Sequence, residues 1–341
     1  MDSKIKLPQI IITAFMAGLF VLAALLGMDI PELISGSFTK FVMNGVLVLA
    51  MIPMINAGVG MNFGLPVGIV AGLLGMCMAI QLRMTGIAGF LGAVALSVVP
   101  AVILGLIYAK ILNMVKGKED IAAIFIGYSF IPIMNFVWTV APFTNREMLY
   151  PVGAEGLRPK ISLENYFGSV LNELFVLKLG KISVPLGLLL AYAAVCLLVY
   201  GFFKTKSGSV MLAVGENEKF CQLSGIRIDR VRTTAIVLST VIGAAGICVY
   251  AQTYGFVELY NAPLSHSFPA VSAILIGGCI GRQAKISHAV LGTYLYQTIY
   301  LLSAPIANAI LIPQMSEIVR MIITNGIILY AFLKQERRRR Q

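Results

Sequence analysis

The sequence predicts an all-α polytopic membrane protein, a bundle of about ten transmembrane helices that forms one domain over residues 1–341. Of these residues, 58% are hydrophobic and only 12% are charged, whereas soluble globular proteins carry about 25% charged residues. The apolar residues gather in long runs whose ends carry Lys and Arg. A helix of about 20 apolar residues spans the hydrocarbon layer of a bilayer. We therefore expect a multi-pass protein of the cell (inner) membrane.

Ten segments have the length and hydropathy of membrane spans. The first follows Lys4 and Lys6 and runs for about 22 residues, which is longer than a signal-peptide core and predicts a retained helix. The eighth is short, so we expect it to be re-entrant or enclosed by protein. The segments are 8–28, 39–56, 61–81, 87–111, 121–142, 183–203, 231–253, 268–281, 286–304 and 315–333.

The distribution of basic residues predicts that both termini lie in the cytoplasm. When the spans alternate from an inner N-terminus, the inner side collects most of the Lys and Arg residues, including those of 204–229 and of the basic tail 334–341. Short cytoplasmic loops carry this excess. The same alternation places 142–182, a long hydrophilic loop, on the outer side.

The outer loop 142–182 has two interpretations that the sequence leaves open. It is either a plain cap over the bundle or a landing surface for a protein that delivers the solute. Its Pro and Gly residues predict turns, and 161–177 predicts a short amphipathic helix.

The third span contains a glycine repeat. Gly60, Gly64, Gly68 and Gly72 recur every fourth residue and predict one stripe along a helix. Such a stripe allows close helix packing, and it could also thin one wall of a translocation path. Pro66 is expected to kink this helix and free a carbonyl group.

A cytoplasmic segment, residues 204–229, interrupts the apolar second half of the chain. Ser207 and Ser209 can cap the start of a helix, and Gly225 can end it. Apolar anchor points alternate there with a polar face, as in helices that dock into another protein. The anchor points are Val210, Met211, Val214, Phe220 and Leu223, and the polar residues are Glu216, Asn217, Glu218 and Lys219.

This segment resembles the cytoplasmic coupling signature of ABC-transporter permeases, in the branch that imports simple sugars, nucleosides and branched-chain amino acids. The resemblance extends from residue 204 to the C-terminus, and over the first half it rests on the helix pattern alone. Phe220 and Cys221 stand where the family has small residues, and 279–283 replaces a glycine-rich turn, which leaves the subfamily open. The matching residues are Gly208, Ala213, Gly215, Asn217, Ser224, Gly225 and Ile226, then 244–246 and 273–278.

The resemblance implies partners and a mechanism. The chain would form half of a pore with a second permease, the same or related, and would work with ATP-binding subunits that hold ATP and Mg²⁺ and with an extracytoplasmic substrate-binding protein. The coupling segment would sit in a groove of the ATP-binding subunit, although any one of its residues is equally explained as part of an ordinary amphipathic helix. The coupling residues would be Val210, Met211, Gly215, Glu216, Asn217, Phe220, Leu223 and Gly225.

Several kinds of chemistry are missing from the sequence. No G-x-x-x-x-G-K-[ST] loop for ATP phosphates occurs, and two histidines with five scattered cysteines offer no metal-ligand spacing or catalytic triad. The basic residues form no stripe interleaved with aromatics, which argues against nucleic-acid binding. Nearly all carboxylates lie in loops, which disfavours a proton relay. We therefore expect no enzyme activity and no cofactor in this chain, with ATP hydrolysis on a partner.

Uncharged polar residues within the spans are candidates for solute contact, first among them Asn56, Asn62, Asn135 and Trp138. Each amide is also explained as an interhelical hydrogen bond. The absence of cationic residues from the expected pathway and the third-span resemblance favour a simple sugar or nucleoside. A branched-chain amino acid is the alternative, and an ion-gradient-driven secondary carrier or a non-transporting scaffold are alternatives of another class.

Overall fold

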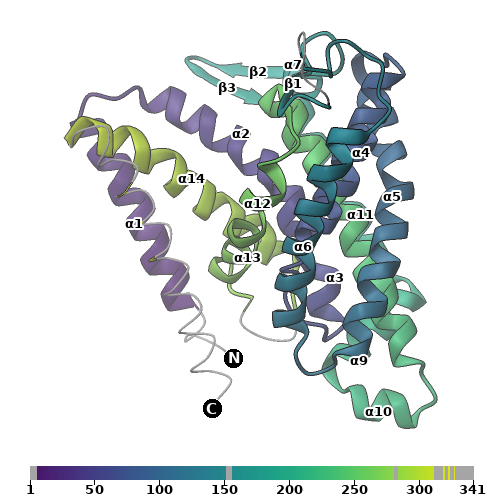
Figure 1. The fold of residues 1–341 in the computed structure, drawn as a ribbon. Coiled ribbons are helices and arrows are strands. Elements are labelled where there is room, and N and C mark those ends of the chain that lie inside the picture. Colours follow the sequence, from purple (N-terminus) through teal and green to yellow (C-terminus); the bar gives the residue numbers. More distant parts are fainter. Residues whose placement is uncertain are drawn as a thin grey trace.

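The computed structural model describes residues 6–150, 156–279 and 283–310, together with residues 318, 322 and 326. Helices dominate this part of the chain, which confirms the predicted all-α class (Figure 1). The helices are α1 (Lys6–Leu25), α2 (Ile30–Leu49), α3 (Met51–Asn56), α4 (Leu65–Gln81), α5 (Gly86–Met114), α6 (Glu119–Val140), α7 (Val170–Glu173), α8 (Leu186–Lys204), α9 (Lys206–Glu216), α10 (Glu218–Leu223), α11 (Ile228–Tyr254), α12 (Ala262–Ser265), α13 (Ser267–Ile276) and α14 (Ile286–Ile310). The strands are β1 (Lys160–Ser162), β2 (Val176–Leu179), β3 (Ile182–Pro185) and β4 (Phe256–Glu258).

The first nine predicted spans each coincide with a helix or a pair of helices, and the tenth, 315–333, falls almost entirely outside the described residues, as does the tail 334–341. Within the described ranges, five helical segments are long and apolar enough to cross a membrane: Ile30–Asn56, α5, α6, α8 and α11. Helices α1, α4 and α12–α13 are apolar but shorter. The structure therefore supports an integral membrane protein, and full spans are supported for five segments rather than ten.

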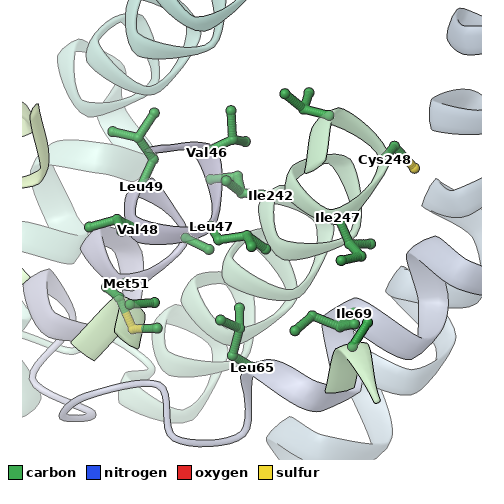
Figure 2. Close-up of a cluster of buried hydrophobic side chains, with 14 of the residues drawn as sticks. Val46, Leu47, Val48, Leu49, Met51, Leu65, Ile69, Ile242, Ile247 and Cys248 are labelled. Atoms are coloured by element: carbon green, nitrogen blue, oxygen red, sulfur yellow. The ribbon is translucent and has the colours of Figure 1, made fainter. Parts of the chain in front are cut away.

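The centre of the bundle is formed by α2, α3 and α11, against which α4, α5 and α14 pack. Figure 2 shows Leu47 of α2 beside Ile242 and Ile247 of α11, with Leu65 of α4 below them. The most apolar 18 residues of each segment differ in burial. Of these residues, 78% are buried in Ile30–Asn56, against 28% in α6 and 22% in α8. The outer helices α6 and α8 expose large apolar side chains such as Phe136 and Leu198, as expected of surfaces that face lipid.

Small residues bring α4 and α11 into close contact. A methyl group at Gly68 would lie 2.8 Å from the Thr240 carbonyl oxygen, and one at Gly72 would collide with Ile247. The predicted four-glycine stripe is wrong in extent: Gly60 has φ +114° and lies before α4, and Gly64 is the residue that precedes the helix. The predicted kink at Pro66 is also wrong, because Pro66 lies in the first turn of α4, where no intrahelical N–H is needed.

The outer loop is a compact, mixed structure, and the amphipathic helix predicted over 161–177 is wrong. Strand β1 pairs with β4, β2 pairs with β3, and among residues 156–182 only the single turn α7 is helical. The β1–β4 pair is closed by an ion pair of 2.5 Å between Lys160 and Glu258, whose carboxylate raises the pKa of the lysine. A helix was predicted because the sequence gives no sign of a strand partner about 95 residues away.

Loops that the alternation assigns to one side of the membrane meet at one end of the bundle. At one end, the backbone N–H of Ser183 donates to Ser35 at 3.0 Å, and Gln81 donates to Thr144 at 2.7 Å. At the other end, Lys116 pairs with Asp229, and α9 packs against α3 (Figure 1). Following the predicted topology, we call the end with Ser183 and Gln81 the outer end and the end with Lys116 and α9 the inner end.

Candidate functional site

The coupling segment, residues 204–229, forms two helices, α9 and α10, that meet at Asn217. Thr205, rather than the predicted Ser207 or Ser209, caps α9: its backbone is extended, and its hydroxyl accepts a hydrogen bond from Gly208 N at 3.3 Å. Asn217 caps α10 in the same way, accepting from Phe220 N at 3.0 Å. Gly225 then takes φ +80°, a conformation that ends helices readily in glycine. Asn217 therefore sets the break between the two helices.

The two helices bury one side and expose large apolar residues on the other. Met211 is 1% exposed, and Cys221 packs with Val214 and Ile228 in a small apolar cluster. By contrast, Phe220 is 67% exposed and Leu223 is 90% exposed. Among the predicted contact residues, Met211 and Gly215 therefore lie inside the chain and Val210 is half-buried, whereas Glu216, Asn217, Phe220, Leu223 and Gly225 are exposed.

The end of α9 lies directly on the inner end of α3. A side chain at Gly215 would collide with the Asn56 carbonyl oxygen, and one at Gly58 would lie 3.2 Å from the Gly215 Cα atom. Gly58 itself has φ +70°. Two glycines are thus required for the close approach of these two backbones.

Asn56 extends this contact to a third segment, the loop before α14. Its side chain donates to the Ala284 carbonyl at 3.1 Å and accepts from the Ala284 N–H at 2.7 Å, and it is 2% exposed. In the same place Gln283 donates to Glu216 of α9. The coupling segment, α3 and the start of α14 therefore meet around one buried amide, and we call this meeting point the inner junction. A displacement of α9 would therefore shift α3 and the loop before α14 through direct contacts.

Ion pairs brace the inner end beside the inner junction. Arg232 of α11, 2% exposed, donates to Glu119 at 2.6 Å and to Asn113 at 3.1 Å. Asp120 accepts from the backbone N–H of Met61 at 3.2 Å. Sequence reasoning treated these charges only as indicators of topology. An arginine and a carboxylate at the ends of two spans that the predicted topology places on the same side are the signal that could have predicted the pair.

Asn62 belongs to a second buried network, which links α11, α5 and the segment before α4. It donates to Ser239 at 2.7 Å and accepts from the Tyr108 hydroxyl at 3.1 Å. Ser239 in turn donates to the Ala50 carbonyl. The side chains of Asn62, Tyr108 and Ser239 are all buried. Like Asn56, Asn62 therefore uses its amide to join structural elements.

Asn135 and Trp138, one turn apart near the outer end of α6, differ from the two buried amides. The Asn135 Oδ1 atom and the Trp138 Nε1 atom are buried without a hydrogen-bond partner in the described structure. The Trp138 side chain is fully enclosed. Among the predicted pathway residues, these two retain unused hydrogen-bonding capacity.

Within the described ranges, no cluster of three His, Cys, Asp or Glu side chains could hold a metal ion. The five cysteines are free thiols. The inner junction consists of a close backbone contact at Gly215 and of the paired side-chain amide of Asn56. It is suited to passing a movement of the coupling segment into the bundle.

Comparison with protein families identifies the class of protein that this fold defines. The chain matches the family model described as branched-chain amino acid transport system / permease component over residues 9–329. The match covers nearly the whole chain, so the protein belongs to this family of ABC-transporter permeases, as the residues of the coupling segment predicted. Searches of curated proteins and of solved structures found no match.

Proposed function

We propose that the chain is the membrane-spanning permease subunit of an ATP-driven ABC importer, which moves a small polar solute across the inner membrane by alternating access. Membership of the permease family supports a transport subunit. The observation that carries the proposal further is the inner junction, where Gly215, Asn56 and Ala284 join the coupling segment to two parts of the bundle. Closure of an ATP-binding subunit on α9–α10 would move α3 and α14 through these contacts.

The partners follow from this role. Phe220 and Leu223, exposed at the tip of the coupling segment, are suited to a groove of an ATP-binding subunit that holds ATP and Mg²⁺. As in the importers that the sequence resembles, the chain would form one half of a pore that a second permease of the same or a related sequence completes. The folded outer loop offers a surface to an extracytoplasmic substrate-binding protein.

The solute is proposed to be a simple sugar or a nucleoside. The absence of cationic residues from the expected pathway and the neutral amide and indole groups of Asn135 and Trp138 favour a hydroxyl-rich ligand. The alternative is a branched-chain amino acid, in keeping with the description of the family. A direct binding comparison of ribose, uridine and leucine, each added to the transporter with its binding protein, separates these classes.

The docking role is tested by placing a carboxylate on the apolar tip. Leu223→Asp is expected to abolish co-purification of the ATP-binding subunit from detergent-solubilised membranes, because a charge would replace an apolar anchor. Gln222→Asp is the matched control, since it puts the same group on the neighbouring exposed position of α10 and is expected to leave co-purification intact. Equal binding by both variants, or no bound ATPase with the wild-type chain, would reject the proposal in favour of an ion-driven carrier.

A further inference from the structure

A second site lies at the inner end, in a pocket between the start of α9 and the start of α11. Its volume is about 240 Å³. Each helix contributes a basic residue and, one turn later, a further lining residue: Lys206 with Val210 on α9, and Arg230 with Thr234 on α11. The remaining lining residues are Ser207, Met211 and Val231. We call this space the basic pocket.

The charge of the basic pocket is uncompensated within the described part of the chain. Its lining contains two cations and no carboxylate, and neither Lys206 nor Arg230 belongs to an ion pair there. The neighbouring Asp229 is held by Lys116 at 2.5 Å. Arg232, two residues further along α11, is neutralised by Glu119. The pocket therefore offers a positive site for an anion.

The floor of the basic pocket is apolar, which narrows the class of anion. Three of the lining residues, Val210, Met211 and Val231, have apolar side chains, and Met211 is 1% exposed; we call these three residues the floor. A free inorganic anion gains nothing from such a floor, whereas an amphipathic ligand can place its charged group on Lys206 and Arg230 and its apolar part on the floor.

The position of the pocket relative to α8 indicates where such a ligand would come from. Helix α8 exposes Leu197 and Leu198 along its length, and near its end the Lys204 Nζ atom lies 5.3 Å from the centre of the Tyr200 ring. Tyrosine and lysine of this kind mark the boundary between hydrocarbon and headgroups. The first residue that lines the basic pocket, Lys206, lies two residues after the end of α8. We therefore expect the pocket to lie close to the lipid phosphates of the adjoining leaflet.

We propose that the basic pocket binds the phosphate of an anionic phospholipid of the inner leaflet and that this lipid braces α9 against α11. The inference rests on the proposed function only in placing this end of the molecule at the cytoplasmic face. The same chemistry could be supplied by free phosphate, and the apolar floor favours the lipid. The bound lipid would hold the coupling segment in position, since α9 also forms the inner junction.

The test uses the full chain without any ATP-binding subunit, so its outcome is independent of the docking experiment. Phosphatidylglycerol retained after purification is measured by native mass spectrometry, for the wild-type chain and for Lys206→Gln combined with Arg230→Gln. The double variant is expected to lose roughly 30-fold in lipid affinity, because each basic residue near an anionic lipid surface contributes about 1 kcal/mol to binding. The control, Lys219→Gln combined with Arg227→Gln, removes the same charge from exposed positions of the same segment, outside the pocket.

Three outcomes would overturn the proposal. Equal loss in the control pair would indicate diffuse attraction rather than a site, and equal retention of phosphatidylcholine would exclude recognition of the anionic group. Displacement of the lipid by millimolar inorganic phosphate would identify free phosphate as the ligand. Retention that depends on Lys206 and Arg230, requires phosphatidylglycerol and resists inorganic phosphate would establish the lipid site.

Discussion

The inner junction and the outer part of α6 use polar side chains inside the bundle in opposite ways. At the inner junction, both ends of the Asn56 amide are bonded to the backbone of Ala284. On α6, Asn135 Oδ1 and Trp138 Nε1 are buried and have no partner in the described structure. All three residues were predicted from the same argument, as polar groups within spans that would contact solute.

This difference distinguishes polar groups that stabilise the fold from polar groups that remain free to bind a ligand. A buried amide with both ends bonded fixes the relative position of two segments, and breaking it leaves unsatisfied backbone groups. A buried polar atom without a partner contributes no such bond, and its desolvation is compensated only if water or a ligand reaches it. Asn56 and Asn62 are therefore expected to matter for the fold and for coupling, and Asn135 and Trp138 for the solute.

The largest effect is expected at the inner junction. Asn56→Leu would orphan the N–H and C=O of Ala284 and lower the free energy of unfolding by about 3 kcal/mol, measured by reversible unfolding in mixed detergent micelles. Asn44→Leu is the control, because Asn44 is also a buried amide of the same helical region, but it donates to the Lys40 carbonyl one turn earlier in its own helix and not to a distant segment of the described chain. Equal destabilisation by both variants would show that the bonds between Asn56 and Ala284 contribute no more to the free energy of unfolding than a hydrogen bond within one helix.

The positions of the helices could be predicted from the sequence, whereas the contacts of single polar residues could not. Long apolar runs with basic ends located the apolar helices, such as α5, α6, α8 and α11, because hydropathy is a property of the local sequence. The partner of Asn56 lies 228 residues away, and nothing local distinguishes it from Asn135. The glycine repeat misled for the same reason: its spacing is helical, but Gly60 has a positive φ and lies against Asp120, which is 60 residues away in the sequence.

The close contact between α9 and α3 gives the second-largest expected effect. Gly215→Ala would push a methyl group into the Asn56 carbonyl, and overpacking of this kind costs about 2 kcal/mol. Because the contact lies on the proposed coupling route, solute-stimulated ATPase activity is expected to fall as well. Gly201→Ala serves as the control, since a methyl group there meets no atom within 4 Å; a decline of the same size in this variant would point to a general effect of helix glycines.

A smaller, local effect is expected from the cap between α9 and α10. Asn217→Ala removes the hydrogen bond to Phe220 N, and loss of such a cap costs about 1 kcal/mol. The amide hydrogens of α10 would exchange faster, by roughly fivefold, while those of α9 stay protected by the inner junction. Hydrogen exchange followed by mass spectrometry resolves the two helices. Unchanged exchange in α10 would mean that contacts of Cys221, rather than the cap, hold this helix.

The smallest effect on stability, and the most informative one on function, is expected at Asn135. Asn135→Leu keeps the size of the side chain and removes an oxygen atom that bonds to nothing in the described structure, so the free energy of unfolding should change by less than about 1 kcal/mol. If solute reaches α6, uptake into proteoliposomes falls while stability and ATP-binding-subunit association stay normal, which is the reverse of the result expected for Asn56→Leu. Unchanged uptake would remove Asn135 from the pathway, and a loss of stability as large as that of Asn56→Leu would erase the distinction between the two regions.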